Sequence, residues 1–268
     1  MVDFQCKSRY GWEDFLEIMR LLRSPGGCPW DAEQTHDSIR REFLEETYEA
    51  LDAIDHDDPA GMCEELGDIL MQVAFHTQIE RERGRFTMDD VVDGIAQKMV
   101  YRHPHVFGGT MQADNSEQVL VNWEVLKRKE KGQQSTADAI EAVPHTLPAL
   151  WRAEKVQKKT AKVGFDWSNP MGALEKLEEE VRELRAALES GNAADVPHGI
   201  REELGDVLFA AAKIGQMSGV DPEDALHCAC DKFDARFRYV ETASDKPLDE
   251  CSEEELLALW KKAGTKES

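Results

Sequence analysis

Apolar residues recur every three or four positions through most of the chain. In EFLEETYEALDAI (residues 42–54), a spacing of about 100° per residue places the apolar side chains on one side of a helix and the acids on the other. Alternating runs of β-branched residues, which would indicate strands, are absent from the sequence. The pattern predicts helices at about 10–23, 35–56, 60–83, 88–101, 115–131, 148–162, 170–190, 196–217, 222–242 and 252–263. The breaks between them are rich in Gly, Pro, Asp and Ser, as turns require, so we expect an all-α protein.

The pentapeptide EELGD occurs twice, at residues 64–68 and 202–206, and each copy runs into an apolar stretch. The repeat extends beyond these five residues. Glu45, Glu46 and Glu49 match Glu179, Glu180 and Glu183 at an offset of 134, Glu65 and Asp68 match Glu203 and Asp206 at 138, and Lys98 and Arg102 match Lys232 and Arg236 at 134. The chain therefore reads as two copies of one helical unit. We expect an N-terminal unit at 1–110, a linker with a helix at 111–147, and a C-terminal unit at 148–268.

The composition narrows the class of protein. A formal charge of −22 argues against a general nucleic-acid or anionic-membrane partner, because either needs a cationic surface. No stretch approaches the roughly 18 apolar residues of a membrane helix, and the amino terminus lacks the layout of a signal peptide. The six cysteines form no CxxC pair, so we expect reduced thiols, some of them buried, including Cys228 and Cys230. These features predict a cytoplasmic protein.

The acids of the second EELGD lie in an unusual setting. The segment VLFAAA that follows, residues 207–212, has no polar side chain, and a helix that is apolar nearly all round is expected to be buried. Glu203 and Asp206 would then share one strip of a buried helix, at a cost of roughly several kcal/mol per ionised carboxylate. A divalent cation removes that cost, and carboxylate oxygens suit Mg²⁺ or Mn²⁺ better than zinc. The alternative is an ordinary solvated acidic face.

Two basic residues accompany each acidic pattern. Lys232 and Arg236 are four apart in CDKFDARFRYVE, and Lys98 and Arg102 are four apart in QKMVYRHPHVF, so each pair shares one helical face. They are either internal salt-bridge partners or ligands for phosphate. Their recurrence with the acids favours a joint role, in which acids hold the metal and bases bind a polyphosphate.

The pattern EExxE, then ExxD, then KxxxR, in tandem copies with RHPHVFG after the first, resembles MazG nucleoside triphosphate pyrophosphohydrolases. CPWDAEQTH, GFDW and the terminal ELLALWKKA extend the resemblance over essentially the whole chain. The resemblance implies tandem helical-bundle units of the all-α NTP pyrophosphatase fold and a homodimer. It also implies Mg²⁺-dependent hydrolysis of ribo- and deoxyribonucleoside triphosphates to the monophosphate and pyrophosphate.

Site residues follow from the resemblance by position. The implied metal ligands are Glu180, Glu183, Glu203 and Asp206 with Glu179 beside them, and in the first copy Glu46, Glu49, Glu65 and Asp68 with Glu45. The implied phosphate ligands are Lys232 and Arg236, and in the first copy Lys98 and Arg102. Trp260 either stacks on the base or belongs to the core. The family favours the C-terminal copy as the principal site, although neither copy has lost an acid or a base.

The expected chemistry is in-line attack of water on the α-phosphorus, with pyrophosphate leaving. Mg²⁺ held by the acids would polarise the phosphoryl oxygens and lower the pKa of a bound water. Lys232 and Arg236 would neutralise the charge on the departing phosphates. Glu179 would orient or deprotonate the attacking water. A non-catalytic Mg²⁺-dependent nucleotide-binding regulator and a helical scaffold with a charged surface are the alternatives. His103 and His105, on either side of Pro104, are expected to form a structural turn.

Overall fold

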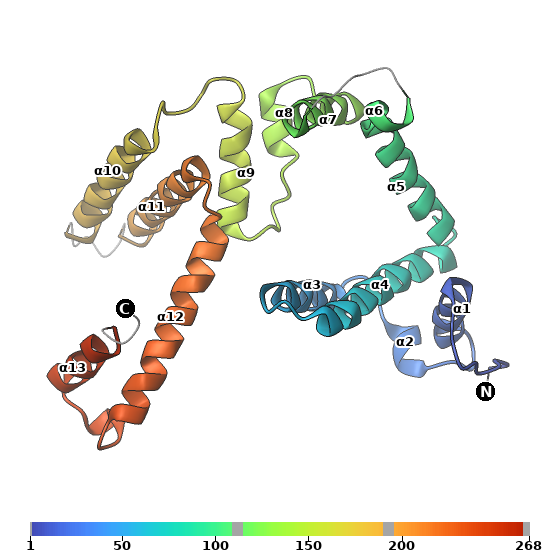
Figure 1. Cartoon of the computed structure of the whole chain (residues 1–268), viewed down its shortest axis with the longest axis horizontal. Coiled ribbons are helices and arrows are strands. Elements are labelled where there is room, and N and C mark those ends of the chain that lie inside the picture. The colour runs from blue at the N-terminus through green and yellow to red at the C-terminus, as the bar shows by residue number, and fades with distance from the viewer. Residues whose placement is uncertain (1, 109–114, 190–195, 265–268) are drawn as a thin grey trace. The chain divides into compact units, whose positions relative to one another are not determined.

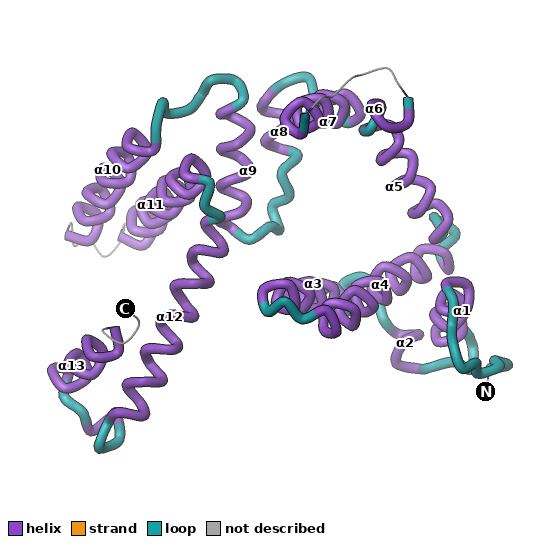
Figure 2. Tube along the Cα trace, in the orientation of Figure 1, coloured by secondary structure: helices purple, strands orange, loops and turns teal. Residues whose placement is uncertain are grey.

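A computed structural model describes residues 2–108, 115–189 and 196–264. All regular elements in these ranges are helices, which confirms the all-α prediction (Figure 2). The chain divides into two compact units, Met1–Lys127 and Arg128–Ser268, with the boundary inside helix α7 (Ser116–Glu130). The division into 1–110, 111–147 and 148–268 stays a prediction. Within the described residues, no helix combines the length and apolar character that crossing a membrane requires.

The first unit is built on a helical hairpin. Helices α3 and α4 pack along each other, α1 packs on α4, and α5 follows α4 (Figure 1). The helices of this unit that precede α7 are α1 (Trp12–Arg23), α2 (Pro29–Glu33), α3 (Arg40–Asp55), α4 (Pro59–Glu82), α5 (Met88–Arg102) and α6 (Pro104–Phe107).

The core of the first unit lies at one end of this hairpin. Its buried side chains come from α1, the turn before α3, the second half of α4 and the start of α5: Met19, Ile39, Ala74, Phe75, Ile79 and Met88. The first half of α4, which begins with Asp58 as N-cap and Pro59 in the first turn, carries EELGD and lies outside this core. The acids of the first copy therefore lie outside the apolar core, where Glu46 and Glu65 are half-buried and Glu49 is exposed.

The second unit repeats the hairpin with α10 and α11. Helix α9 packs on α8, α11 and α12, and α13 packs on α12 (Figure 1). The elements are α8 (Thr136–Glu141), α9 (Ala149–Ala161), α10 (Pro170–Glu189), α11 (Val196–Ser218), α12 (Pro222–Ala243), a 3₁₀ turn η1 (Leu248–Glu250) and α13 (Glu253–Gly264). Asp221 caps α12 by accepting hydrogen bonds from Glu223 N and Asp224 N, and it also accepts one from Trp151 Nε1 of α9 at 2.9 Å. One side chain thus fixes where α12 starts and how it meets α9.

The structure differs from the sequence expectation at several points. The helix expected from residue 35 begins at Arg40, and short helices α2, α6 and α8 form in segments expected as loops. Pro29 and Pro104 open the first two, because proline suits the first turn of a helix, and Ser135 caps the third by accepting from Asp138 N.

Two burial expectations are wrong. Helix α11 is not buried all round within its unit, since Leu208 and Phe209 remain 47% and 45% exposed. All six cysteines are free, as expected, but none is buried, and Cys228 and Cys230 are exposed. Cys228 and Cys230 lie on α12. The order of residues does not show how much of α11 and α12 is covered by neighbouring helices.

Candidate metal and nucleotide site

The hairpin of the second unit brings three predicted acids together. Glu180 of α10 and Glu203 and Asp206 of α11 each place a carboxylate oxygen within 4.8 Å of the others. Glu180 is only 6% exposed, and Glu203 is half-buried. Glu183 lies one turn after Glu180, and burial followed by the charge of Glu180 raises the pKa of its carboxyl group. Carboxylates held this close repel one another, so the arrangement favours a cation among them.

Lys176 is a neighbour of this cluster that the sequence analysis did not single out. Its Nζ lies 2.7 Å from Oε1 of Glu179 and 2.7 Å from Oε1 of Glu180. The hydrogen bond from Lys176 lowers the pKa of Glu179, whose carboxylate is therefore a weaker base than an isolated glutamate. The sequence feature that could have identified Lys176 is its position, one turn before Glu180 on the same face of the helix.

The first unit has a cluster between its corresponding helices, but one of its three positions differs. It includes Glu49, the counterpart of Glu183, where the second cluster includes Asp206, the counterpart of Asp68. Glu46 of α3, Glu49 of α3 and Glu65 of α4 each place one oxygen within 4.8 Å of the others. Burial and then the charge of Asp68 raise the pKa of Glu46, and burial and then the charge of Glu49 raise the pKa of Glu65. Among the described residues, neither Glu42 Oε2 nor Glu65 Oε2, both buried, has a hydrogen-bond partner. Glu42, one turn before Glu46, is a further acid that the sequence analysis did not assign to the site.

Both clusters suit a hard divalent cation. Their donors are carboxylate oxygens from two packed helices, which is the ligand type of Mg²⁺ and Mn²⁺, and this set does not separate those two ions. The buried, unpartnered oxygen of Glu65 is the atom that a cation would satisfy in the first unit.

The predicted substrate-binding residues of the second unit gather on α12 and α13. The guanidinium carbon of Arg236 lies 5.9 Å from the centre of the Trp260 ring, and the rings of Phe233 and Trp260 are 5.0 Å apart at an angle of 48°. Lys232, one turn before Arg236, is exposed. An aromatic ring beside a cation offers a surface for a base next to a ligand for phosphate.

The corresponding bases of the first unit are placed differently. Arg102 is buried at 6% exposure, and its guanidinium carbon lies 5.6 Å from the ring centre of Trp123 in α7. Lys98 is half-buried on the same helix. His103 Nδ1 donates to Met99 O at 2.6 Å where α5 ends, as expected of a residue in a structural turn.

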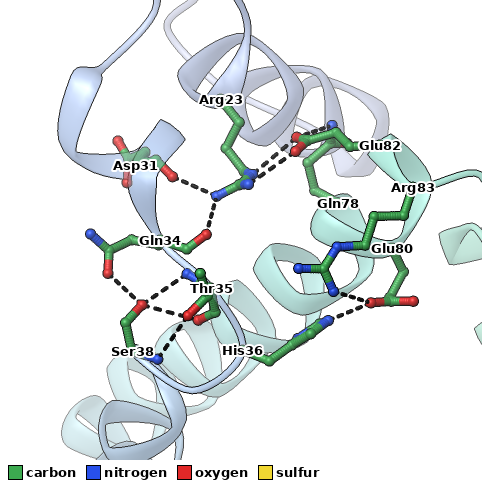
Figure 3. Close-up of polar contacts among 10 residues, drawn as sticks. All are labelled: Arg23, Asp31, Gln34, Thr35, His36, Ser38, Gln78, Glu80, Glu82 and Arg83. Carbon is green, nitrogen blue, oxygen red and sulfur yellow. Dashed lines mark hydrogen bonds and ion pairs between the residues drawn. The ribbon is translucent and has the colours of Figure 1, made fainter.

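A polar network in the first unit holds the segment before α3 against α1 and α4 (Figure 3). Arg23 of α1 forms an ion pair with Glu82 at 2.9 Å and donates to the backbone oxygen of Gln34 at 3.1 Å. His36 Nε2 binds the buried carboxylate of Glu80. Oε1 of Glu80 also accepts a hydrogen bond from Arg83 Nη1 at 3.3 Å. No local pattern in the sequence indicates this network, although CPWDAEQTH contains part of it.

The second unit ties the equivalent segment by another ion pair. Lys213 of α11, 2% exposed, lies 2.6 Å from Asp166 of the GFDW loop, and its Nζ also donates to Gln216 Oε1 at 2.5 Å. In each unit, a contact between the loop before the first helix of the hairpin and the second helix fixes the relative position of the two helices that carry the acids.

Tandem helical hairpins, each with a cluster of carboxylates on facing helices, define a class of all-α proteins suited to metal-dependent phosphate chemistry. The model of the MazG nucleotide pyrophosphohydrolase domain matches residues 34–107 and 169–240, which include both clusters and both Lys/Arg pairs. The chain belongs to the MazG nucleotide pyrophosphohydrolase family.

Relatives of the chain span most of its length. The nucleoside triphosphate pyrophosphohydrolase/pyrophosphatase MazG of Thermotoga maritima is 42% identical over 94% of this chain and 95% of its own. The nucleoside triphosphate pyrophosphohydrolase of Escherichia coli K12 is 44% identical over 84% and 85%. The uncharacterized protein YabN of Bacillus subtilis is 45% identical over 93% of this chain, but that match covers 50% of YabN.

Proposed function

We propose that the protein hydrolyses nucleoside triphosphates between the α- and β-phosphates, releasing the nucleoside monophosphate and pyrophosphate. The observation that carries this proposal is the cluster of Glu180, Glu203 and Asp206 within a segment that matches the pyrophosphohydrolase domain. The names of the relatives from T. maritima and E. coli supply the substrate class and the reaction.

Glu180, Glu183, Glu203 and Asp206 hold Mg²⁺ in this proposal, and Mn²⁺ suits the same oxygens. A cation bound there supplies Lewis acidity at the phosphates. Glu179 lies next to Glu180 and outside the four ligands, so its carboxylate orients the attacking water. Because Lys176 keeps this carboxylate ionised and lowers its pKa, orientation suits Glu179 better than full removal of a proton.

Lys232 and Arg236 bind the phosphates and neutralise the charge that builds on the departing pyrophosphate. Trp260 stacks on the base, a role supported by its contact with Arg236. A base that is bound mainly by stacking is compatible with several nucleotides, since every base has an aromatic face.

The second copy is the principal catalytic site in this proposal. In the first copy, the acids Glu46, Glu49, Glu65 and Asp68 keep the same pattern with Lys98 and Arg102, but Arg102 is buried beside Trp123. A buried guanidinium is less accessible to a triphosphate than the half-buried Arg236. This difference supports the division of roles between the copies.

The working form in this proposal is a cytoplasmic homodimer. Helix α11 leaves Leu204, Leu208 and Phe209 between 45% and 47% exposed, and α3 leaves Phe43 and Leu51 37% and 39% exposed. Apolar faces on the helices that carry the acids are expected to be covered by protein, because leaving such surface in water is unfavourable. A second copy of the chain is the partner that the family resemblance implies.

The test is incubation of the purified protein with each nucleoside triphosphate and Mg²⁺, with pyrophosphate and orthophosphate measured separately. Pyrophosphate release supports the proposal, orthophosphate release indicates another hydrolase, and binding without product indicates the non-catalytic regulator. Glu203→Gln is expected to lower the release of pyrophosphate by about 100-fold or more.

A matched control is Glu202→Gln, since Glu202 is the exposed acid next to Glu203 on the same helix. This variant is expected to stay within about twofold of the wild type. To remove any contribution of the first copy, Glu203→Gln is combined with Glu65→Gln. More than about a tenth of the activity remaining in that double variant contradicts the proposed site.

A further inference from the structure

The two copies carry opposite charges at one position beside the acidic cluster. Glu42 of the first copy corresponds to Lys176 of the second at the offset of 134 that relates the flanking acids. Each residue lies one turn before the first acid of its cluster, Glu46 or Glu180, and therefore on the same face of the helix. The difference at this position is two units of charge.

In the second unit, the ammonium of Lys176 already occupies one side of the cluster. Its Nζ lies 2.7 Å from Oε1 of Glu180, a carboxylate that is 6% exposed and that belongs to the proposed metal ligands. A divalent cation that enters this cluster without a nucleotide must either displace the ammonium or bind beside a like charge. Either case weakens the binding of the cation.

In the first unit, the same position adds a negative charge. Within the described structure, Glu42 Oε2 is buried and accepts no hydrogen bond, so this carboxylate has an oxygen without a donor next to the cluster. An additional carboxylate strengthens the attraction for a cation and weakens that for a polyphosphate.

The residues before this position do not cancel the difference. Arg41 in the first copy and Glu175 in the second have the reverse charges, so the total charge of the two segments is similar. However, the side chain of Arg41 is 85% exposed and pairs with Glu45 at 3.0 Å, outside the group of oxygens that forms the cluster. Glu42 and Lys176 therefore determine the sign of the charge that lies beside each cluster.

We propose that this position makes the two sites unequal: the first unit binds a divalent cation from solution without nucleotide, whereas the second takes up its cation only together with the triphosphate. The second unit needs the triphosphate because the negative charge of the triphosphate offsets the ammonium of Lys176. This inference rests on the proposed function for the identity of the substrate, but cation binding by the first unit does not require turnover.

The experiment is titration of the full chain with Mn²⁺ in the absence of nucleotide, with free Mn²⁺ followed by electron paramagnetic resonance. The wild type is expected to show one tight class of site per chain, which Glu49→Gln removes and Glu183→Gln leaves in place. Glu42→Lys should weaken the tight class by at least about tenfold. Lys176→Glu should create a second tight class, and Lys176→Met should strengthen binding at the second cluster without adding a ligand.

The control is Glu175→Lys, which changes the charge by the same amount at the exposed neighbouring position and should leave Mn²⁺ affinity within about twofold. Circular dichroism verifies that each variant keeps its helical content. Two equal tight classes in the wild type, the absence of any tight class, or unchanged affinities in Glu42→Lys and Lys176→Glu would each overturn the inference. Pyrophosphate release is assayed separately, so failure of the proposed reaction is distinguishable from failure of the cation asymmetry.

Discussion

The ion pair between Lys213 and Asp166 is the contact of the second unit whose loss should be most visible. The Lys213 side chain is 2% exposed, and its Nζ lies 2.6 Å from Asp166 Oδ1 and 2.5 Å from Gln216 Oε1. Replacing Asp166 by Asn removes the negative charge but keeps the shape of the side chain. The variant leaves a buried ammonium with neutral acceptors only.

The expected loss of stability follows from the burial of the two partners. Removing one partner of a fully buried ion pair costs about 3–5 kcal/mol. The Asp166 side chain is 23% exposed, so water screens part of this interaction, and we expect Asp166→Asn to lower the free energy of unfolding by about 2–3 kcal/mol. The control is Glu154→Gln, because Lys158 and Glu154 are also 2.6 Å apart but the Lys158 side chain is 51% exposed. This control should cost about 0–1 kcal/mol.

Urea denaturation followed by circular dichroism measures both variants. The double variant Asp166→Asn with Lys213→Met should recover part of the loss, since it leaves no buried charge without a partner. If Asp166→Asn cost no more than Glu154→Gln, the burial of Lys213 would not determine the strength of the pair and the reasoning would be refuted.

Two further predictions concern the site. Burial and neighbouring carboxylates raise the pKa of Glu65 and Glu183, so these groups stabilise the metal-free fold at low pH and that contribution is lost as pH rises through their folded pKa values. Because Mg²⁺ must displace the same protons, its effect on the melting temperature should be larger at about pH 8 than at about pH 5, and an equal shift in calorimetry would count against cation binding at these groups. Trp260→Ala should raise KM for nucleoside triphosphates by about tenfold or more with little change in kcat, whereas Trp260→Phe should keep most of the affinity; a fall in kcat alone would argue against stacking.

Local patterns in the sequence were sufficient to predict the helices and to recognise the repeat. A helix face repeats every three or four residues, so EFLEETYEALDAI and the segment around EELGD could be assigned without long-range information. The same spacing predicted that Glu203 and Asp206 share one strip of a helix. Their grouping with Glu180 of α10 came from the resemblance to the family. The roles of these acids as metal ligands stay predictions, although the structure brings their oxygens within 4.8 Å.

Burial and long-range pairing were decided by the tertiary structure. Whether an apolar helix is covered depends on what packs around it, and Leu208 and Phe209 are left partly exposed by their own unit. The pairing of Lys213 with Asp166 and of His36 with Glu80 joins residues more than forty positions apart, which no helical period encodes.

The sequence by itself determined the class of this protein: an all-α chain with a duplicated set of acids and bases, because both features depend on local spacing and on the identity of side chains. Only the tertiary structure showed that Lys176 binds Glu180 while its counterpart Glu42 keeps a buried oxygen without a donor. The strength of a charge interaction depends on distance and on burial, and neither is written in the order of the residues.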